Sequence, residues 1–278
     1  MLSRLLCLFS FPVLLLCCTE PPDPEAAEPI TLRRENISLT IDPANGGRIV
    51  SLRFAGKEVL SELRDSMGFQ YGSVSWPGPQ ADWNWPPPAA LDRDPYTVQK
   101  VEQHSVMLTS DPDPATGLVL QKRYRLGPDS DIGLTYWITN RSDTLRSVGA
   151  WEVTRLPYSG TFEFYSDSLR VERGNARTLD SEGNHHRIVL DDRQAHTTKV
   201  FTKLDTVPAT YVNNGVVLEK HTVVTDFYRV APDQAPLEIY LAPRAGFVEF
   251  ELHGDYRKLG FGETSTLRSK WVLRSVAR

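Results

Sequence analysis

Apolar and polar residues alternate in short runs along most of this chain, and this pattern constrains the fold more than any other feature. The first run places Ile37, Leu39 and Ile41 on one face of a strand, and the turn sequence Asn45-Gly46-Gly47 follows it. The same pattern predicts further strands over residues 49–54, 97–109, 117–126, 131–139, 146–156, 161–165, 197–203, 209–213, 215–220, 222–230, 237–242, 246–252 and 267–275. Residues 58–65 are the one weak candidate for a helix. Regularly spaced short strands predict an all-β sandwich or barrel.

Length and composition are those of one globular domain. The chain has 278 residues, of which 40% are hydrophobic and 24% are charged, and its net charge is −4. An all-β chain of about 200–250 residues commonly forms a single domain. Domains that bind nucleic acid normally carry an excess of basic residues, so we expect no nucleic-acid partner.

The N-terminus resembles the signal of a bacterial lipoprotein. Arg4 precedes an apolar segment, residues 5–16, that is too short to span a bilayer. We expect residues 1–17 to be removed and Cys18 to be acylated, because Cys17 then fills the small-residue position before the cleavage site. Acylation of Cys17 and plain secretion are the alternatives. The expected location is the bacterial periplasm or outer membrane, with a lipid anchor as the only contact with the membrane.

A short acidic tether follows the signal. Residues 18–30 combine acidic residues and prolines with no basic residue and almost no apolar bulk, so they cannot form a core. The predicted folded domain therefore comprises residues 31–278. The three cysteines of the chain, Cys7, Cys17 and Cys18, all precede it, so the domain can form no disulfide and no thiolate metal site.

Residues 71–92 concentrate tryptophan and proline. Trp76, Trp83 and Trp85 lie within ten residues of one another, and five prolines accompany them. Because proline cannot donate to a strand ladder, the stretch is predicted not to be an interior strand but a stiff loop over the end of the sheets. Indole rings match the apolar faces of sugars, and Asp82, Asn84 and Asp92 could bind hydroxyl groups. The alternative is that these aromatic side chains plug the end of the sandwich.

Two predicted strands carry candidate acid/base residues. In the strand around Trp151, the face that holds Arg155 is opposite the face that holds Glu152, so a direct pair between these two would need a bulge. In residues 246–254, alternation places Glu249, Glu251 and His253 on one face. Such a row can perform acid/base chemistry when it is buried and is unremarkable when it faces solvent. For Glu152, a structural salt bridge is the alternative to a catalytic role.

A histidine-containing segment is the one further candidate for a metal site. His185, His186 and His196 lie near Asp191 and Asp192, and zinc accepts such ligands. The neighbouring glycine and charged residues are typical of an exposed loop, so we expect no metal there. We also find no phosphate-binding loop and no nucleophile elbow, and we expect no cofactor.

Several of these segments occur in an order that resembles a known family. They are the opening strands joined by Asn-Gly-Gly-Arg-Ile, the tryptophan-rich stretch that ends at Asp92, the strand Trp151-Glu-Val-Thr-Arg155, the strand with Glu249 and Glu251, and a later Gly-Phe-Gly-Glu turn followed by Trp271. Over roughly residues 32–276 the chain resembles an uncharacterised domain family within the galactose-mutarotase-like superfamily. The resemblance implies a β-supersandwich with a saccharide pocket on its concave face.

The resemblance also implies a catalytic pattern, from which this chain departs. In mutarotases a glutamate removes the proton of the anomeric hydroxyl and a histidine protonates the ring oxygen. The resemblance places the glutamate on Glu251, or on Glu249 if the register slips. The strand of the histidine corresponds to residues 148–156, which contain Trp151 and Glu152 but no histidine. A Glu152/Glu251 pair could replace the usual pair, or catalysis could be absent.

Three functional hypotheses follow. The first is an exported, lipid-anchored carbohydrate-binding domain, the second an enzyme of the aldose-epimerase type, and the third a structural surface module. The residues expected to bind a saccharide are Trp76, Trp83, Trp85, Asp92, Trp151, Arg155 and His253.

Overall fold

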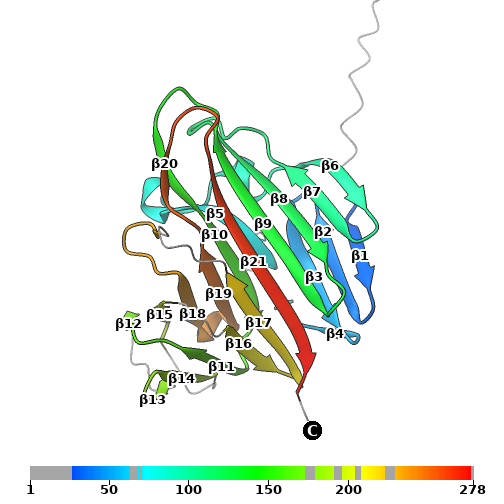
Figure 1. Ribbon diagram of the computed structural model, residues 1–278, viewed down its shortest axis with the longest axis vertical. Helices are drawn as coiled ribbons and strands as arrows, with labels where there is room; N and C mark the ends of the chain where they lie inside the picture. Colours follow the sequence, from blue (N-terminus) through cyan, green and yellow to red (C-terminus); the bar gives the residue numbers. More distant parts are fainter. Residues whose placement is uncertain are drawn as a thin grey trace, which may run out of the picture.

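The computed structural model describes residues 27–62, 68, 71–172, 179–190, 196–203, 208–222 and 229–276. The expected signal peptide, Cys18 and most of the expected tether lie outside these residues. Strands dominate the described part (Figure 1), and its helices are single turns: η1 (Gln80–Asp82), α1 (Ala89–Asp92) and η2 (Pro243–Ala245). No helix among the described residues is long and apolar enough to cross a membrane.

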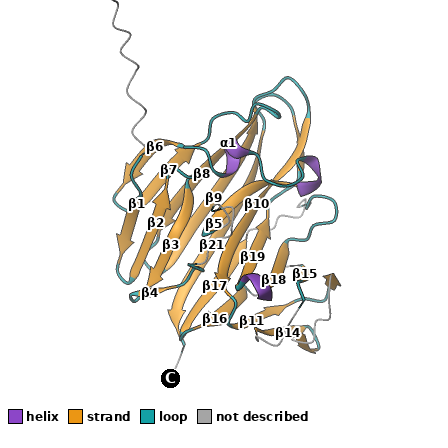
Figure 2. Cartoon of the chain, turned by 180° about the vertical axis from the view of Figure 1, so that it is seen from behind, coloured by secondary structure: helices purple, strands orange, loops and turns teal. Residues whose placement is uncertain are grey.

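The strands form two antiparallel sheets, which Figure 2 shows from behind. The first sheet has the order β1-β2-β3-β5-β10-β19-β18-β15-β12, with β4 paired to β3 and β20 paired to β10. Its strands are β1 (Ile30–Arg34), β2 (Ile37–Asp42), β3 (Arg48–Phe54), β4 (Lys57–Glu58), β5 (Ser73–Gly78), β10 (Arg146–Pro157), β12 (Leu169–Glu172), β15 (Thr198–Thr202), β18 (Leu237–Ala242), β19 (Phe247–His253) and β20 (Arg257–Leu259).

The second sheet has the order β13-β14-β11-β16-β17-β21-β9-β8-β7-β6. Its strands are β6 (Thr97–Glu102), β7 (Ser105–Thr109), β8 (Leu118–Leu126), β9 (Asp131–Asn140), β11 (Gly160–Tyr165), β13 (Leu179–Glu182), β14 (His185–Leu190), β16 (Ala209–Asn213), β17 (Val216–Thr222) and β21 (Thr264–Ser275).

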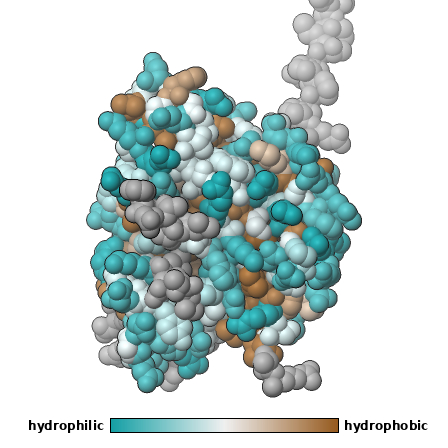
Figure 3. Space-filling view, in the orientation of Figure 1, coloured by the Kyte–Doolittle hydropathy of each residue, from teal (hydrophilic) through white to brown (hydrophobic). Residues whose placement is uncertain are grey.

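The core lies between the two sheets. Val248, Phe250 and Leu252 of β19 are fully buried members of it, and the ring of Phe250 meets Phe162 of the second sheet at 5.2 Å between centroids. Successive side chains of a strand point to opposite faces, so the residues between them lie on the outer face of the first sheet. In Figure 3, which looks onto the side of β9 and β21, hydrophilic residues cover most of the surface.

The prediction of an all-β, single-domain sandwich is confirmed. The alternation places residues correctly because each strand buries one face against the opposite sheet; the strand predicted at residues 237–242, for example, is β18. The strand predicted at 222–230 falls largely outside the described residues. Of the weak helical candidate at 58–65, Glu58 ends strand β4 and residues 63–65 lie outside the described part.

One expectation about the tryptophan-rich stretch is wrong. Residues Ser73–Gly78 form β5, an interior strand between β3 and β10, although it contains Pro77. The register explains why the proline is tolerated. On the β3 side the pairing is limited to Ile49 and Ser73, whereas β10 pairs along the whole length of β5. The half of β5 that carries Pro77 therefore has one neighbouring strand, which is the position where a strand accepts proline.

Candidate functional site

A cleft of about 510 Å³ lies on the outer face of the first sheet. Five neighbouring strands of the sheet, β10, β19, β18, β15 and β12, contribute to its floor, and β5, η1 and the loop at residues 232–234 form its sides. Its lining includes Trp76, Trp85, Trp151, Arg155, Glu172, Lys199, Phe201, Glu238, Tyr240, Phe247 and Glu249. The lining mixes aromatic rings with charged groups, as expected of a pocket for a polar small molecule.

The strand register arranges the side chains of this face in rows. Trp151 pairs with Trp76 on one side and with His253 on the other. In a second row, Glu251 of β19 pairs with Glu238 of β18. Partners in an antiparallel ladder point to the same face, so segments far apart in the sequence contribute to a single surface.

Trp76 is the centre of an aromatic cluster. Its ring meets Trp151 at 5.2 Å, Trp85 at 5.9 Å and Trp83 at 6.2 Å between centroids, each in an edge-to-face arrangement. Trp76 and Trp151 are buried, whereas Trp85 is 41% exposed and forms part of the cleft wall. Trp83 lines a separate hollow of about 450 Å³ and donates a hydrogen bond to the carbonyl of Pro77.

Asp92 holds Trp76 of this cluster through a hydrogen bond but does not line the cleft. It ends α1, is 1% exposed, and accepts a hydrogen bond of 2.7 Å from Nε1 of Trp76. The guanidinium of Arg48, which is also fully buried, lies 3.4 Å from the same carboxylate oxygen. The expectation that Asp92 binds ligand hydroxyls therefore does not fit its position, because its carboxylate is enclosed by protein groups.

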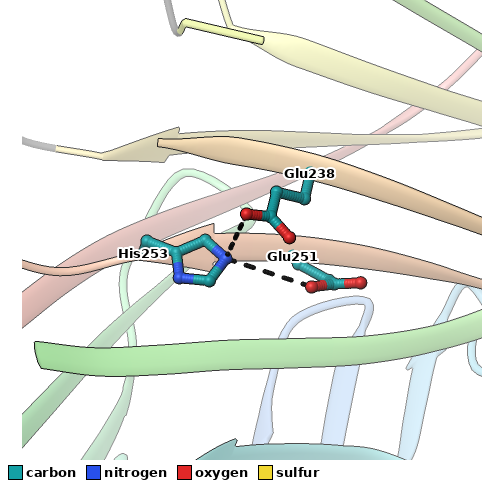
Figure 4. A group of neighbouring side chains, drawn as sticks. All are labelled: Glu238, Glu251 and His253. Carbon is teal, nitrogen blue, oxygen red and sulfur yellow. Dashed lines mark ion pairs between the residues drawn. The ribbon is translucent and has the colours of Figure 1, made fainter. Parts of the chain in front are cut away.

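Glu238, Glu251 and His253 form a buried cluster (Figure 4), and Lys199 pairs with both of its carboxylates. The ammonium of Lys199 lies 2.6 Å from Oε2 of Glu238 and 3.1 Å from Oε2 of Glu251. Nε2 of His253 lies 3.3 Å from Oε1 of Glu238 and 4.0 Å from Oε2 of Glu251. Of these four residues, Lys199 and Glu238 reach the cleft, whereas Glu251 and His253 lie beneath its lining.

Trp151 covers Glu251. The indole Nε1 donates a hydrogen bond of 2.8 Å to Oε2 of Glu251, and the indole ring stacks on His253 with centroids 5.3 Å apart. Glu251 is fully buried as a result. The glutamate that the family resemblance points to is thus held by protein partners in this chain.

The two glutamates of the cluster have pKa values shifted in opposite directions. Burial raises the pKa of Glu251 to about 8, although Lys199 opposes the shift. Burial also disfavours the ionised form of Glu238, but His253 and Lys199 outweigh it and lower the pKa of Glu238 to about 2. Burial lowers the pKa of His253, which favours the neutral imidazole.

The same cluster is the group of side chains, among those described, whose geometry could hold a metal ion. The ligand atoms of Glu238, Glu251 and His253 lie within 4.8 Å of one another. However, the ammonium of Lys199 already lies against both carboxylates. A metal ion would have to displace the Lys199 ammonium and the proton of Glu251. The two carboxylates therefore suit the lysine side chain better than a bound metal ion.

Arg155 forms a second ion pair in the cleft. Its Nη2 lies 2.7 Å from Oε1 of Glu249, its partner in the register between β10 and β19. The guanidinium lies between the rings of Trp76 and Phe247, at 5.8 and 5.4 Å from their centroids. Arg155 and Glu249 thus line the cleft and pair with each other, and Arg155 does not pair with Glu152.

Glu152 lies on the opposite face of β10, between the sheets. It is fully buried, and its Oε1 lies 2.7 Å from Nζ of Lys220 on β17 and accepts a hydrogen bond from Nε1 of Trp271. The proposed Glu152/Glu251 catalytic pair is therefore not formed, because neighbouring residues of the two strands alternate between faces. The alternative of a structural salt bridge describes Glu152.

The histidine segment is also placed differently from the expectation of an exposed loop. His185 and His186 belong to β14, and His186 is buried. Its two ring nitrogens lie 2.8 Å from Oγ of Ser181 and 2.9 Å from the carbonyl of Ser166. Asp191 and Asp192 lie outside the described residues.

Among the residues of the cleft that sequence reasoning missed are Lys199, Glu238 and Tyr240. Each is the outward member of an alternating strand, and Glu238 stands between the apolar residues Leu237 and Ile239. A carboxylate in so apolar a context signals a buried, partnered group. The strands that bring these residues to Glu251 are neighbours through tertiary pairing, which alternation alone does not reveal.

Comparisons with known proteins agree with this architecture. A family model described as a domain of unknown function, DUF4380, matches residues 27–274, and no curated protein matches the chain. A galactose mutarotase-like protein from Lactobacillus casei is 15% identical with a TM-score of 0.64, over 89% of this chain and 100% of that chain. An aldose epimerase homologue from C. elegans is 10% identical with a TM-score of 0.61, over 90% and 99% of the two chains.

A third solved structure places the same fold in a larger protein. A TPR-domain containing protein from Parabacteroides distasonis is 17% identical with a TM-score of 0.65, over 90% of this chain but 47% of that chain. The fold is galactose mutarotase-like, as the sequence resemblance implied.

Proposed function

Because this chain belongs to the DUF4380 family, whose description assigns no activity, we propose its function from its own cleft: it is a carbohydrate-binding domain that holds a saccharide on the outer face of the first sheet. The observation that carries the proposal is the composition of this cleft. Trp85 offers an exposed aromatic ring, and Trp151 lines the cleft beside the polar groups of Lys199, Glu238 and Glu249.

Such a combination suits a sugar. The C–H faces of a pyranose pack on aromatic rings, and its hydroxyl groups donate to carboxylates and accept from ammonium groups, in hydrogen bonds that a charged partner strengthens. The polar groups stand on paired strands and are fixed by ion pairs such as Lys199 with Glu238. A rigid set of this kind binds with little loss of side-chain entropy.

Binding without mutarotation is the form of the proposal that the side chains favour. The strand expected to carry the catalytic histidine carries Trp151, and Trp151 covers Glu251. A base must reach the proton that it removes, and Glu251 does not line the cleft. The alternative is an enzyme of the aldose-epimerase type, which the raised pKa of Glu251 favours because a carboxyl group with a pKa of about 8 can exchange a proton near neutral pH.

A glycan array and titration calorimetry test the binding proposal. Replacing Trp85 with alanine removes an exposed ring of the cleft wall, and we expect affinity for the bound saccharide to fall by about tenfold or more, since a stacked ring contributes on the order of 1 kcal/mol or more. Trp137→Ala is the matched control, because Trp137 is a partly buried tryptophan on β9 of the second sheet. Equal losses in both variants, or no saccharide bound by the parent protein, would contradict the proposal.

Anomer exchange measured by NMR separates binding from catalysis. For a binding domain, the rate of anomer exchange in the presence of the protein equals the rate in buffer. Glu251→Gln then leaves both this rate and the saccharide affinity near their parent values. An exchange rate that rises with protein concentration and falls to the buffer rate in Glu251→Gln would establish the enzymatic alternative.

We further propose that the protein is exported and anchored by acylation of Cys18. The sequence of residues 1–18 supports this proposal. Metabolic labelling with a fatty acid and membrane fractionation test it. Cys18→Ser is expected to lose the label, whereas Cys7→Ser keeps it. Retention of the label in Cys18→Ser with its loss in Cys17→Ser would move the site of acylation by one residue.

A further inference from the structure

A row of five polar side chains crosses the floor of the cleft. The strand register aligns Arg155 with Glu249, Glu249 with Tyr240, Tyr240 with Lys199 and Lys199 with Glu172. Adjacent strands lie about 4.8 Å apart, so the row extends over roughly 19 Å. It begins at β10 near the middle of the first sheet and ends at β12, the last strand of that sheet among the described residues.

The exposure of the row increases from one end to the other. The side chain of Arg155 is 2% exposed and that of Glu249 is 11% exposed, and the rings of Trp76 and Phe247 flank Arg155. The side chain of Lys199 is 20% exposed and that of Glu172 is 48% exposed. Within the described part of the chain, the cleft is therefore closed near β10 and open where the row reaches β12.

We propose that the cleft binds the end of a saccharide chain, with the terminal unit near Arg155 and Glu249 and the following units along the row towards Glu172. This inference rests on the proposed function and specifies its substrate class. A cleft of about 510 Å³ is larger than one pyranose ring requires, and the spacing between strands is close to the length of one sugar unit. The row holds two basic groups, two carboxylates and the phenol of Tyr240 between them, so successive units meet both hydrogen-bond donors and acceptors.

Chain length is the variable that tests the inference. The full-length protein, purified in detergent, is titrated with mono-, di- and tetrasaccharides of glucose, galactose, mannose, N-acetylglucosamine and glucuronate. We expect the tetrasaccharide of the preferred series to bind at least about tenfold more tightly than the monosaccharide, since one additional hydrogen bond to a charged group is enough for a gain of that size. A monosaccharide that binds as tightly as its tetrasaccharide would overturn the inference and leave the proposed function intact. No binding in any series would overturn both.

A variant at the open end tests the direction of the chain. Glu172→Gln is expected to weaken tetrasaccharide binding several-fold while leaving monosaccharide binding unchanged. Glu102→Gln is a matched control, because Glu102 is also an exposed strand residue that is ion-paired with the basic residue two positions before it. Unchanged tetrasaccharide affinity in Glu172→Gln, or an equal loss in both variants, would overturn the inference. The control for folding is thermal unfolding, in which both variants should unfold at the temperature of the parent protein.

Discussion

At the scale of single residues, Glu238 and Glu251 occupy the same buried cluster but hold their protons very differently. The pKa of Glu251 is raised to about 8 by burial, and that of Glu238 is lowered to about 2 because His253 and Lys199 outweigh its burial. Between these values one carboxylate is charged and the other is neutral. The charge of Lys199 then balances that of Glu238, so the cluster is close to neutral beneath the cleft.

This arrangement predicts an unusual dependence of stability on pH. Glu251 loses its proton near pH 4.5 in the unfolded chain and near pH 8 in the folded chain, so the folded protein holds the extra proton between these values. The stability that Glu251 contributes must then fall as pH rises through this window, and the lowered pKa of His253 offsets only part of this fall. Glu238 has the opposite sign, because its contribution is present above about pH 4.5 and is lost as pH falls towards 2. We expect the free energy of unfolding from urea titration to fall by at least ~1 kcal/mol from pH 5 to pH 8.

Glu251→Gln isolates the source of the effect. The amide is neutral at every pH and keeps an oxygen that can accept the hydrogen bond from Trp151, so the fall between pH 5 and pH 8 should disappear. Glu163→Gln, on the second sheet, is the control and should keep the parent slope. A slope that persists unchanged in Glu251→Gln would show that another group holds the proton.

At the scale of elements, the turn between β2 and β3 is fixed by its contact with α1. Gly46 has φ +71°, and a Cβ there would lie 1.8 Å from the carbonyl oxygen of Asp92. Gly56 has a similar φ of +80°, but nothing lies within 4 Å of the position of its Cβ. Both glycines permit a left-handed backbone conformation, but the approach of another element constrains only Gly46.

Substituting alanine at these two positions should therefore give unequal losses. Gly56→Ala should lower the free energy of unfolding only by the cost of the left-handed backbone, which is about 1–2 kcal/mol. Gly46→Ala must also move α1 away from the turn, and we expect a loss of at least ~3 kcal/mol in the free energy of unfolding. Because Asp92 holds Trp76, Gly46→Ala should also change the near-ultraviolet circular dichroism of the tryptophans. Equal stabilities of the two variants would contradict this account.

Elements also mark the limit of what the sequence could predict. Alternation placed Glu249, Glu251 and His253 on one face, because a strand fixes the direction of its own side chains. It could not show that β18 and β15 lie beside β19, since pairing between strands is set by the packing of the whole sheet. The same limit explains why β5 was not predicted. Pro77 argued against an interior strand, but the half of β5 that contains Pro77 lacks a partner strand on one side and therefore accepts the proline.

At the scale of the whole molecule, the first sheet separates two roles between its faces. The outer face carries the cleft, and the inner face joins the second sheet through the core and through a buried ion pair. That pair is Glu152 of β10 with Lys220 of β17, both fully buried, at 2.7 Å. Thr154 and the carbonyl of Phe250 accept the other hydrogen bonds of the ammonium. The first sheet thus supplies every one of these acceptors for a lysine of the second.

The pair is expected to stabilise the contact between the sheets without affecting the cleft. Glu152→Leu leaves the Lys220 ammonium buried without its carboxylate, and such a loss costs about 3–5 kcal/mol. Lys220→Met alone should lower the free energy of unfolding by a similar amount. The double variant removes both charges, so its loss should be less than half of the sum of the two single losses. Urea unfolding measures the free energies of unfolding of the three variants. Calorimetry at temperatures where the variants are folded should give parent-like saccharide affinity, because Glu152 faces away from the cleft. A variant that stays stable but loses its affinity would instead link Glu152 to the ligand, and the separation of roles between the two faces would then be wrong.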